Sequence, residues 1–310
     1  MRKISMVMKK LSWFILFALI AYTSYAQIPT IDEPKKEEVI SLVFDSTRNA
    51  IEVSDSKYDP SIQAFVGQEL FLKPLEESKR KDGYLSIVTM DYKHQSPPYL
   101  YRYGQYDKIS GQTFKVIGID STLTRYNGYV FTLQMKADET VMCKYIYHGT
   151  AWDFPFVTMS YYKYLCSKVV NNKFVISNSV LVNKEQASST EPWKATSISI
   201  DNEGKLFVII KHNEIDNKVL LNDFVTYTES EQKRKAIYTE QEWNDLVKQY
   251  GLPMMKTVLE GKIKVGMPEK LVRYALGAPN KINTSSYGSN QWCYDGIYVY
   301  IKNHKVESWN

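Results

Sequence analysis

The chain has 310 residues, of which 39 are Lys or Arg, 34 are Asp or Glu and 14% are aromatic, with a formal charge of +5. A nucleic-acid binder needs a dense basic face to displace counterions from phosphates. The short basic runs at residues 79–81 and 233–235 have glutamates nearby, which is typical of solvated loops, so nucleic acid is not an expected partner.

The first 26 residues have the pattern of a cleavable secretory signal. Arg2 and Lys3 form a basic start, residues 11–22 are apolar, and Ser24-Tyr25-Ala26 supplies the small residues that a signal peptidase reads. The apolar run of about a dozen residues is short of the roughly 20 that cross a bilayer, so an uncleaved anchor is the less favoured alternative. Cleavage after Ala26 removes four basic residues, leaving 284 residues and a charge of +1. We therefore expect export to the periplasm or cell surface, with no transmembrane span in the mature chain.

Residues 27–60 are expected to be a charged lead-in, and residues 61–236 to be rich in β-strands. Strict alternation with many β-branched and aromatic residues predicts strands at 69–72, 84–90, 113–119, 129–135, 141–147, 156–162, 173–177, 195–200 and 206–211. Asp201-Asn202-Glu203-Gly204 is expected to be a hairpin turn, because Asn and Gly tolerate a positive φ. No helix of ten residues is predicted in this span, which we divide into a β-rich domain at 61–168 and a second domain, or its continuation, at 169–236.

Two segments in this span begin alike. Gly67-Gln68 and Gly111-Gln112 each introduce an alternating segment, 44 residues apart. Such an echo suggests duplicated small barrels of the SH3-like type, and an irregular single β-sandwich or barrel is the alternative.

Residues 237–310 are expected to form a compact α+β unit. Thr239 and Glu242 make a capping box, and apolar residues at helical spacing follow as far as Gly251. Further short helices are predicted over about 253–260 and 268–276, with a strand at 262–265 between them.

An antiparallel sheet is predicted after these helices. Asp295-Gly296 is a strong hairpin signal between strands at 290–294 and 297–301, and a third strand follows at 305–309. The aromatic pairs of this sheet are expected to cover the helices, and they are Trp292 with Tyr294 and Tyr298 with Tyr300.

One pattern runs through residues 254–310. Gly266-Met267-Pro268-Glu269 enters a helix, Leu276-Gly277-Ala278-Pro279 leaves it, and the strands with Trp292, Tyr294, Tyr298 and Tyr300 follow. This segment resembles the SmpA/OmlA-like domain, typified by a small outer-membrane lipoprotein of the β-barrel assembly machinery. The resemblance implies a non-catalytic scaffold of the bacterial envelope that contacts other proteins. The chain departs from the family in having no lipid-attachment cysteine near residue 26 and in the long β-rich region before the segment.

No pattern of catalytic or metal-binding residues is recognisable. The four histidines, at positions 94, 148, 212 and 304, are each at least 50 residues apart, and no nucleophile elbow, phosphate loop or dinucleotide fingerprint occurs. Cys143 with His148 as nucleophile and base is disfavoured, because five residues along a strand place them on opposite faces. We therefore predict no catalytic residue, no cofactor and no metal, and a hydrolase with dispersed carboxylates is the least favoured alternative.

The three cysteines allow two arrangements. Cys143 and Cys166 lie in neighbouring β-like segments and are the candidate disulfide of an exported protein, with Cys293 left as a thiol. Three buried thiols that behave as small apolar residues are the alternative.

The aromatic density is the remaining functional signal. Tyr99, Tyr101, Tyr103 and Tyr106 follow Pro97-Pro98 and form a candidate binding surface for sugar rings or a peptide, unless they are the buried positions of ordinary strands. The sequence thus favours an exported, non-catalytic protein that binds an envelope protein or another envelope component. A carbohydrate- or peptidoglycan-binding protein that uses the tyrosine-rich region is the competing hypothesis.

Overall fold

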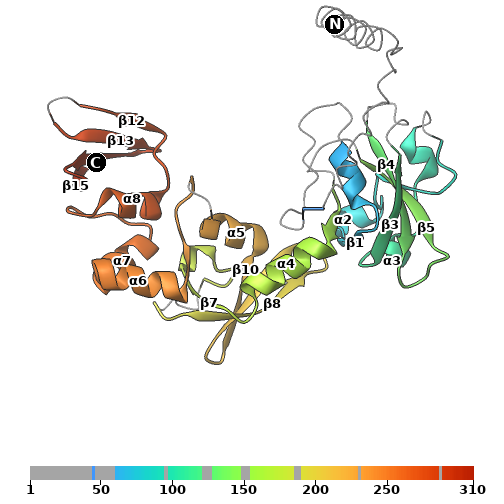
Figure 1. Cartoon of the computed structure of the whole chain (residues 1–310), viewed down its shortest axis with the longest axis horizontal. Helices are drawn as coiled ribbons and strands as arrows, with labels where there is room; N and C mark the ends of the chain where they lie inside the picture. Colours follow the sequence, from blue (N-terminus) through green and yellow to red (C-terminus); the bar gives the residue numbers. More distant parts are fainter. Residues whose placement is uncertain are drawn as a thin grey trace, which may run out of the picture. The chain divides into compact units, whose positions relative to one another are not determined.

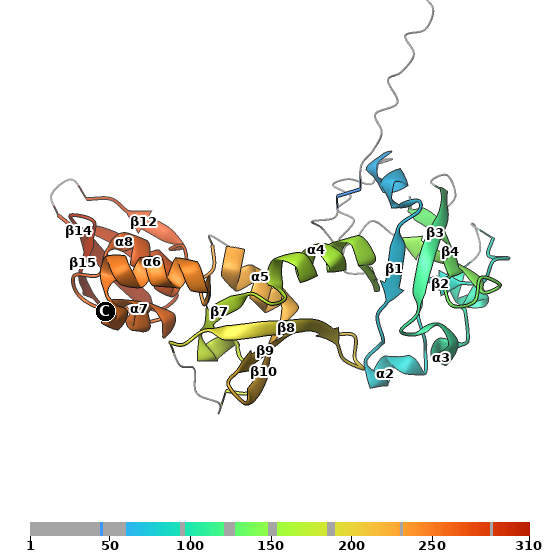
Figure 2. The same cartoon turned by 60° about the horizontal axis from the view of Figure 1, so that its bottom comes forward.

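The structure is a computed structural model that describes residues 44–45, 60–93, 97–120, 128–147, 154–184, 190–229, 232–285 and 288–310. All of these belong to one compact unit, Phe44–Asn310. The expected signal sequence and nearly all of the expected lead-in lie outside the described residues. The unit is mainly β, with three antiparallel sheets that follow one another along the chain (Figures 1 and 2).

The first sheet has six strands in the order β2-β5-β4-β3-β1-β6. The strands are β1 (Glu69–Leu72), β2 (Ile87–Val88), β3 (Thr113–Asp120), β4 (Tyr129–Met135), β5 (Met142–Tyr147) and β6 (Phe156–Thr158). Short helical segments connect them, namely η1 (Pro60–Phe65), α2 (Glu77–Arg80), η2 (Pro98–Tyr101) and α3 (Tyr106–Ile109). The strands predicted at 69–72, 113–119, 129–135 and 141–147 are confirmed, and alternate side chains of β3 and β4 enter one core that is rich in aromatic residues. Of the strand predicted at 84–90, only Ile87–Val88 is formed.

The echo between Gly67-Gln68 and Gly111-Gln112 does not mark two barrels. The strands that these residues introduce, β1 and β3, are antiparallel neighbours in the first sheet, with Leu70 opposite Phe114. Similar entries therefore begin two adjacent strands of a single sheet, so the echo by itself does not separate two barrels.

The second sheet has five strands in the order β10-β9-β8-β7-β11. They are β7 (Lys173–Ile176), β8 (Trp193–Ile200), β9 (Leu206–His212), β10 (Ile215–Leu220) and β11 (Ile237–Thr239). The turn predicted at residues 201–204 is confirmed, because the Glu203 and Lys205 amides both donate to the Asp201 carboxylate at 2.9 Å.

Two helices of this region contradict the prediction of strands alone. The strand predicted at 156–162 ends at Thr158, and α4 (Met159–Val169) begins there, while α5 (Leu221–Glu229) follows β10. Leu165 and Val169 of α4 are four residues apart and buried, as a helix requires. The tyrosines of α4 favour strands locally, and burial of one helical face overrides that preference. A short η4 (Asn178–Val180) lies between β7 and β8.

The third sheet has four strands in the order β12-β13-β14-β15. They are β12 (Lys281–Asn283), β13 (Asn290–Tyr294), β14 (Ile297–Lys302) and β15 (Lys305–Trp309), and α6 (Glu240–Tyr250), α7 (Leu252–Leu259) and α8 (Glu269–Leu276) share its core. The helix start at Thr239 is confirmed, because its hydroxyl accepts the Glu242 amide at 3.2 Å. The strand predicted at 262–265 is not formed. Within the described part of the chain, no helix combines the length and apolar character needed to cross a membrane.

Candidate functional site

One face of the third sheet is packed against the helices. Trp292 is only 4% exposed, and the Arg273 guanidinium of α8 lies 4.7 Å from the centre of its ring system. The Tyr294 hydroxyl donates to the Gly277 carbonyl at 3.2 Å, and burial raises the pKa of Tyr294 to about 12. The expectation that Trp292 and Tyr294 cover the helices is confirmed.

The other aromatic pair lies on the opposite face. Directly paired residues of antiparallel strands share a face, and Trp292 pairs with Val299, whereas Tyr298 pairs with Cys293 and Tyr300 with Gln291. The expectation that Tyr298 and Tyr300 cover the helices is therefore wrong. This second face, which we call the outer face, contains Asn283, Gln291, Cys293, Tyr298 and Tyr300.

The outer face is polar and partly accessible. Tyr298 is 45% exposed. The Gln291 side-chain amide donates to the Tyr300 hydroxyl at 3.0 Å, and Asn283 donates to the Gln291 side-chain oxygen at 2.9 Å. This row of hydrogen bonds fixes the position of the Tyr300 ring from β13 and β12, so the face presents ordered aromatic and amide groups.

The two edges of this sheet differ. The segment before α8 covers β15, because Gly266 donates to the Val306 carbonyl at 2.8 Å and Val306 donates to the Met267 carbonyl at 2.9 Å. At the opposite edge, Lys281, Ile282 and Asn283 of β12 are all exposed, and among the described residues only β13 pairs with this strand. The edge of β12 is thus open to pairing.

Gly277 and Pro279 lie after α8, where the chain packs against residues 232–234. A methyl carbon placed on Gly277 would lie 2.6 Å from the Gln232 carbonyl oxygen, and the Ala278 amide donates to that same oxygen at 3.1 Å. The absence of a side chain at Gly277 therefore allows this close approach of two backbones.

The four tyrosines of the candidate binding surface do not share one exposed surface. Tyr99 is 63% exposed, but Tyr101 packs edge-on against Tyr92 at 5.6 Å and Tyr103 packs against the first core. Tyr106 stacks on Tyr84 at 5.5 Å, and its hydroxyl accepts the Leu75 amide at 3.1 Å. Three of the four are thus structural, and the arrangement does not favour an aromatic platform for sugars.

The Cys143–Cys166 disulfide is not formed, which corrects that expectation. All three cysteines are free thiols. Cys143 is buried in the first core, whereas Cys166 is on α4 and packs against the second core, so the predicted pairing of neighbouring strands does not occur. Burial raises the pKa of the Cys143 thiol to about 12.

A cleft lies beside α4. The helix contacts β1 and β6 of the first sheet and β8 of the second. An apolar cavity of about 230 Å³ lies there, and an adjoining cavity of about 420 Å³ shares Val157, Tyr162 and Leu206 with it. We call the two cavities together the α4 cleft. The apolar cavity is lined by Phe71, Val157, Met159, Tyr162, Ile198, Ile200 and Leu206.

The larger cavity adds charged and polar groups to this apolar wall. It is lined by Lys73, Tyr161, Asn222 and Lys205 together with Phe154, Val157, Tyr162, Leu165, Gly204, Leu206, Leu220 and Leu221. Burial lowers the pKa of the Lys73 amine. The Lys205 amine is 2.7 Å from the Glu203 carboxylate, whereas in the described part of the chain no carboxylate pairs with Lys73.

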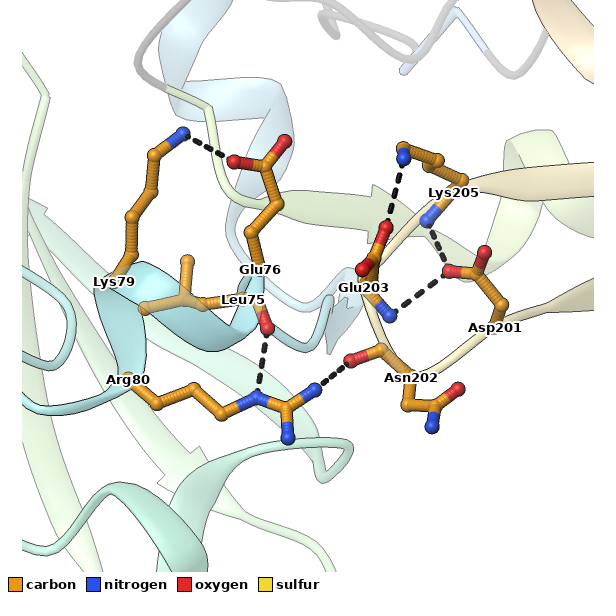
Figure 3. A network of polar contacts seen from close by, with 8 residues as sticks. All are labelled: Leu75, Glu76, Lys79, Arg80, Asp201, Asn202, Glu203 and Lys205. Atoms are coloured by element: carbon orange, nitrogen blue, oxygen red, sulfur yellow. Dashed lines mark hydrogen bonds and ion pairs between the residues drawn. The ribbon is translucent and has the colours of Figure 1, made fainter.

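A polar network joins the segments 75–80 and 201–205, the second of which includes the cavity residue Lys205 (Figure 3). Arg80 of α2 donates to the Leu75 carbonyl at 2.9 Å and to the Asn202 carbonyl in the turn between β8 and β9. Two segments 122 residues apart are thereby joined, and they carry Lys73 and Lys205 into the same cavity. Sequence reasoning missed this site, because its residues come from segments that are distant in the chain.

The remaining titratable groups are dispersed. Across the described ranges, no group of three or more His, Cys, Asp or Glu side chains could hold a metal ion. His212 lies 3.1 Å from the Glu191 carboxylate and His304 lies 3.0 Å from the Glu269 carboxylate, while His94 and His148 fall outside the described residues.

Comparison with known proteins found no matching family model, no matching curated protein and no matching solved structure.

Proposed function

We propose that the chain is an exported, non-catalytic protein of the bacterial envelope that binds another envelope protein through residues 254–310. The observation that carries this proposal is the asymmetry of the third sheet. Its helix side and its β15 edge are covered, whereas the outer face with Tyr298 and the β12 edge are accessible.

These two accessible elements suit protein binding. An exposed edge strand can accept a strand from a partner through backbone hydrogen bonds, which give affinity without a deep pocket. Tyrosine is enriched at protein interfaces, because its ring supplies apolar contact area and its hydroxyl supplies a hydrogen bond. Tyr298 and Lys281 project from the same face, since both pair with Cys293. One partner could therefore contact the edge and the tyrosine face together.

Two features of the sequence support the location. The first 26 residues have the three parts of a secretory signal. Residues 254–310 resemble the SmpA/OmlA-like domain, whose members contact other proteins in the envelope. The resemblance implies a scaffold role, and Met267, Trp292 and Tyr294 of the matching pattern take part in the helix–sheet packing of this unit.

Site-specific photocrosslinking in the producing bacterium tests the proposal. A photoreactive phenylalanine is placed at position 298, at position 281 or, as a control outside this unit, at the exposed position 99. We expect the same protein adduct from positions 298 and 281, in the envelope fraction, and none from position 99.

Mass spectrometry of the isolated chain completes the experiment, with an N-terminus at Gln27 as the expected result. An equal adduct from all three positions, or no adduct from 298 and 281, would overturn the docking proposal. An intact Met1 in the cytoplasmic fraction would overturn the proposed export.

A further inference from the structure

We propose that the α4 cleft binds an amphiphilic anion, a molecule with an apolar chain that ends in a carboxylate or phosphate, with its charged group at Lys73. This site is separate from the outer face of the third sheet, so the inference stands independently of the docking proposed above.

The shape of the cleft fits a molecule with two unlike ends. The smaller cavity is lined by aliphatic and aromatic side chains, among them Phe71, Met159 and Ile198. The larger cavity continues from it past Tyr162 and contains the charged groups. Their volumes, about 230 and about 420 Å³, together fall in the range of small-molecule sites, in which apolar walls supply affinity and a few polar groups fix the orientation.

The charge of the cleft specifies an anion. Lys73 and Lys205 line the larger cavity, and the described residues of its lining include no carboxylate. Glu203 is occupied by Lys205 at 2.7 Å, and Asp223 in the first turn of α5 is not part of the cavity wall. Because Lys205 is paired with Glu203, the unbalanced positive charge of the described lining is that of Lys73, which an anionic group would complement.

Lys73 is the residue that an anion would contact first. Its side chain is half-buried, and among the described residues its amine has no ion-pair or hydrogen-bond partner. A partly desolvated ammonium without a counter-charge is costly. A carboxylate or phosphate bound beside it would offset that cost and form a charge-assisted hydrogen bond.

The local backbone holds Lys73 at this place. Its amide donates to the Pro155 carbonyl at 2.9 Å, and its own carbonyl accepts the Tyr84 hydroxyl at 2.7 Å. Gly204, which also lines the larger cavity, approaches this segment closely, because a methyl carbon placed on it would lie 3.3 Å from the Lys73 Cβ. The lysine stem is thus anchored at its base, and within the described ranges no ion pair or hydrogen bond holds the amine.

Calorimetric titration of the full mature chain tests the inference with dodecanoate, dodecyl phosphate and the neutral dodecanol, all below their micelle concentrations. We expect dodecanoate or dodecyl phosphate to bind at one site per chain and dodecanol to bind roughly tenfold more weakly or worse, since it lacks the charge. Comparison of the two anions identifies the preferred head group.

Matched lysine variants assign the site. Lys73→Met keeps the apolar stem and removes the charge, and it should weaken binding of the anion about tenfold without changing the affinity for dodecanol. Lys73→Arg should restore binding, and Lys79→Met, at an exposed lysine of α2 paired with Glu76 at 3.1 Å, should leave it unchanged.

Ile200→Trp should weaken binding of all three ligands, because it fills the apolar cavity. Circular dichroism shows whether each variant is folded. The inference is overturned if neither anion binds, if Lys73→Met binds as well as the unaltered chain, or if Lys79→Met loses as much affinity.

Discussion

The Gly204 α-carbon lies directly against the Pro74 carbonyl, and a methyl carbon placed on Gly204 would be 2.2 Å from that oxygen. Gly204 also has a positive φ of 77°, which few other residues adopt without strain. This contact brings the turn between β8 and β9 against the segment after β1, beside the Arg80 network of Figure 3.

Gly204→Ala should therefore destabilise the chain by about 1–3 kcal/mol, because the methyl group both strains the backbone and displaces the Pro74 carbonyl. Urea unfolding measures the change. The control is Gly104→Ala, at an exposed glycine with no atom within 4 Å of the added carbon, which should alter the free energy of unfolding by less than about 0.5 kcal/mol. Equal effects of the two substitutions would contradict the close approach.

The two faces of the third sheet predict unequal costs for aromatic truncation. Trp292→Ala should destabilise by about 3–5 kcal/mol, because it removes a buried ring from the helix–sheet core. Tyr298→Ala, on the outer face, should cost less than about 1 kcal/mol. Thermal or urea unfolding gives both values, and a larger loss for Tyr298→Ala would show that the assigned register is wrong.

The cysteines are expected to differ in reactivity. Cys143 is fully buried, and its pKa is raised to about 12 by that burial, so it has almost no thiolate at pH 8. Brief alkylation of the native chain should label Cys166 and Cys293, which are partly exposed, and should label Cys143 only after unfolding. Peptide mass spectrometry reads out each site. A molecular mass 2 Da below that of the reduced chain, measured before reduction, would indicate a disulfide and contradict the free thiols. Labelling of Cys143 in the folded chain would contradict its burial.

Lys73 predicts a dependence of stability on pH. Burial lowers its pKa in the folded state below the unfolded value, so the unfolded chain binds more protons between the two values and stability rises with pH in that window. Lys73→Met removes the buried charge. It should raise the melting temperature at pH 7, and the gain should shrink as the pH approaches 10 and the native lysine loses its proton.

Lys79→Met is the matched control for that measurement, since Lys79 is exposed and paired with Glu76. It should change the melting temperature little at either pH. A gain for Lys79→Met equal to that of Lys73→Met would attribute the effect to net charge instead of burial. If the gain is specific to Lys73→Met, that variant is more stable than the unaltered chain and binds the anion less well, as expected for a residue retained for ligand binding.

Features with a local cause could be predicted well from the amino-acid order. Alternation of apolar and polar side chains located β3, β4, β8 and β9 within a few residues, because the side chains of a strand alternate between its faces. The helix cap at Thr239 and the hairpin at Asp295-Gly296 could also be predicted from sequence, since each depends on backbone groups a few residues apart.

Features that depend on distant partners could not be predicted in this way. The predicted strand at 156–162 overlaps the first turn of α4, where tyrosines favour strands, whereas burial of Leu165 and Val169 favours the helix. The Asp295-Gly296 turn sets Tyr298 opposite Cys293, but which face of that hairpin meets the helices depends on the packing of Trp292 in the core shared with α8. The α4 cleft joins Lys73 to Lys205 through a contact between Arg80 and Asn202. Turns, caps and strand alternation depend on neighbouring residues and can therefore be predicted from sequence. The α4 cleft depends on packing between segments that are distant in the chain, so only the tertiary structure determines it.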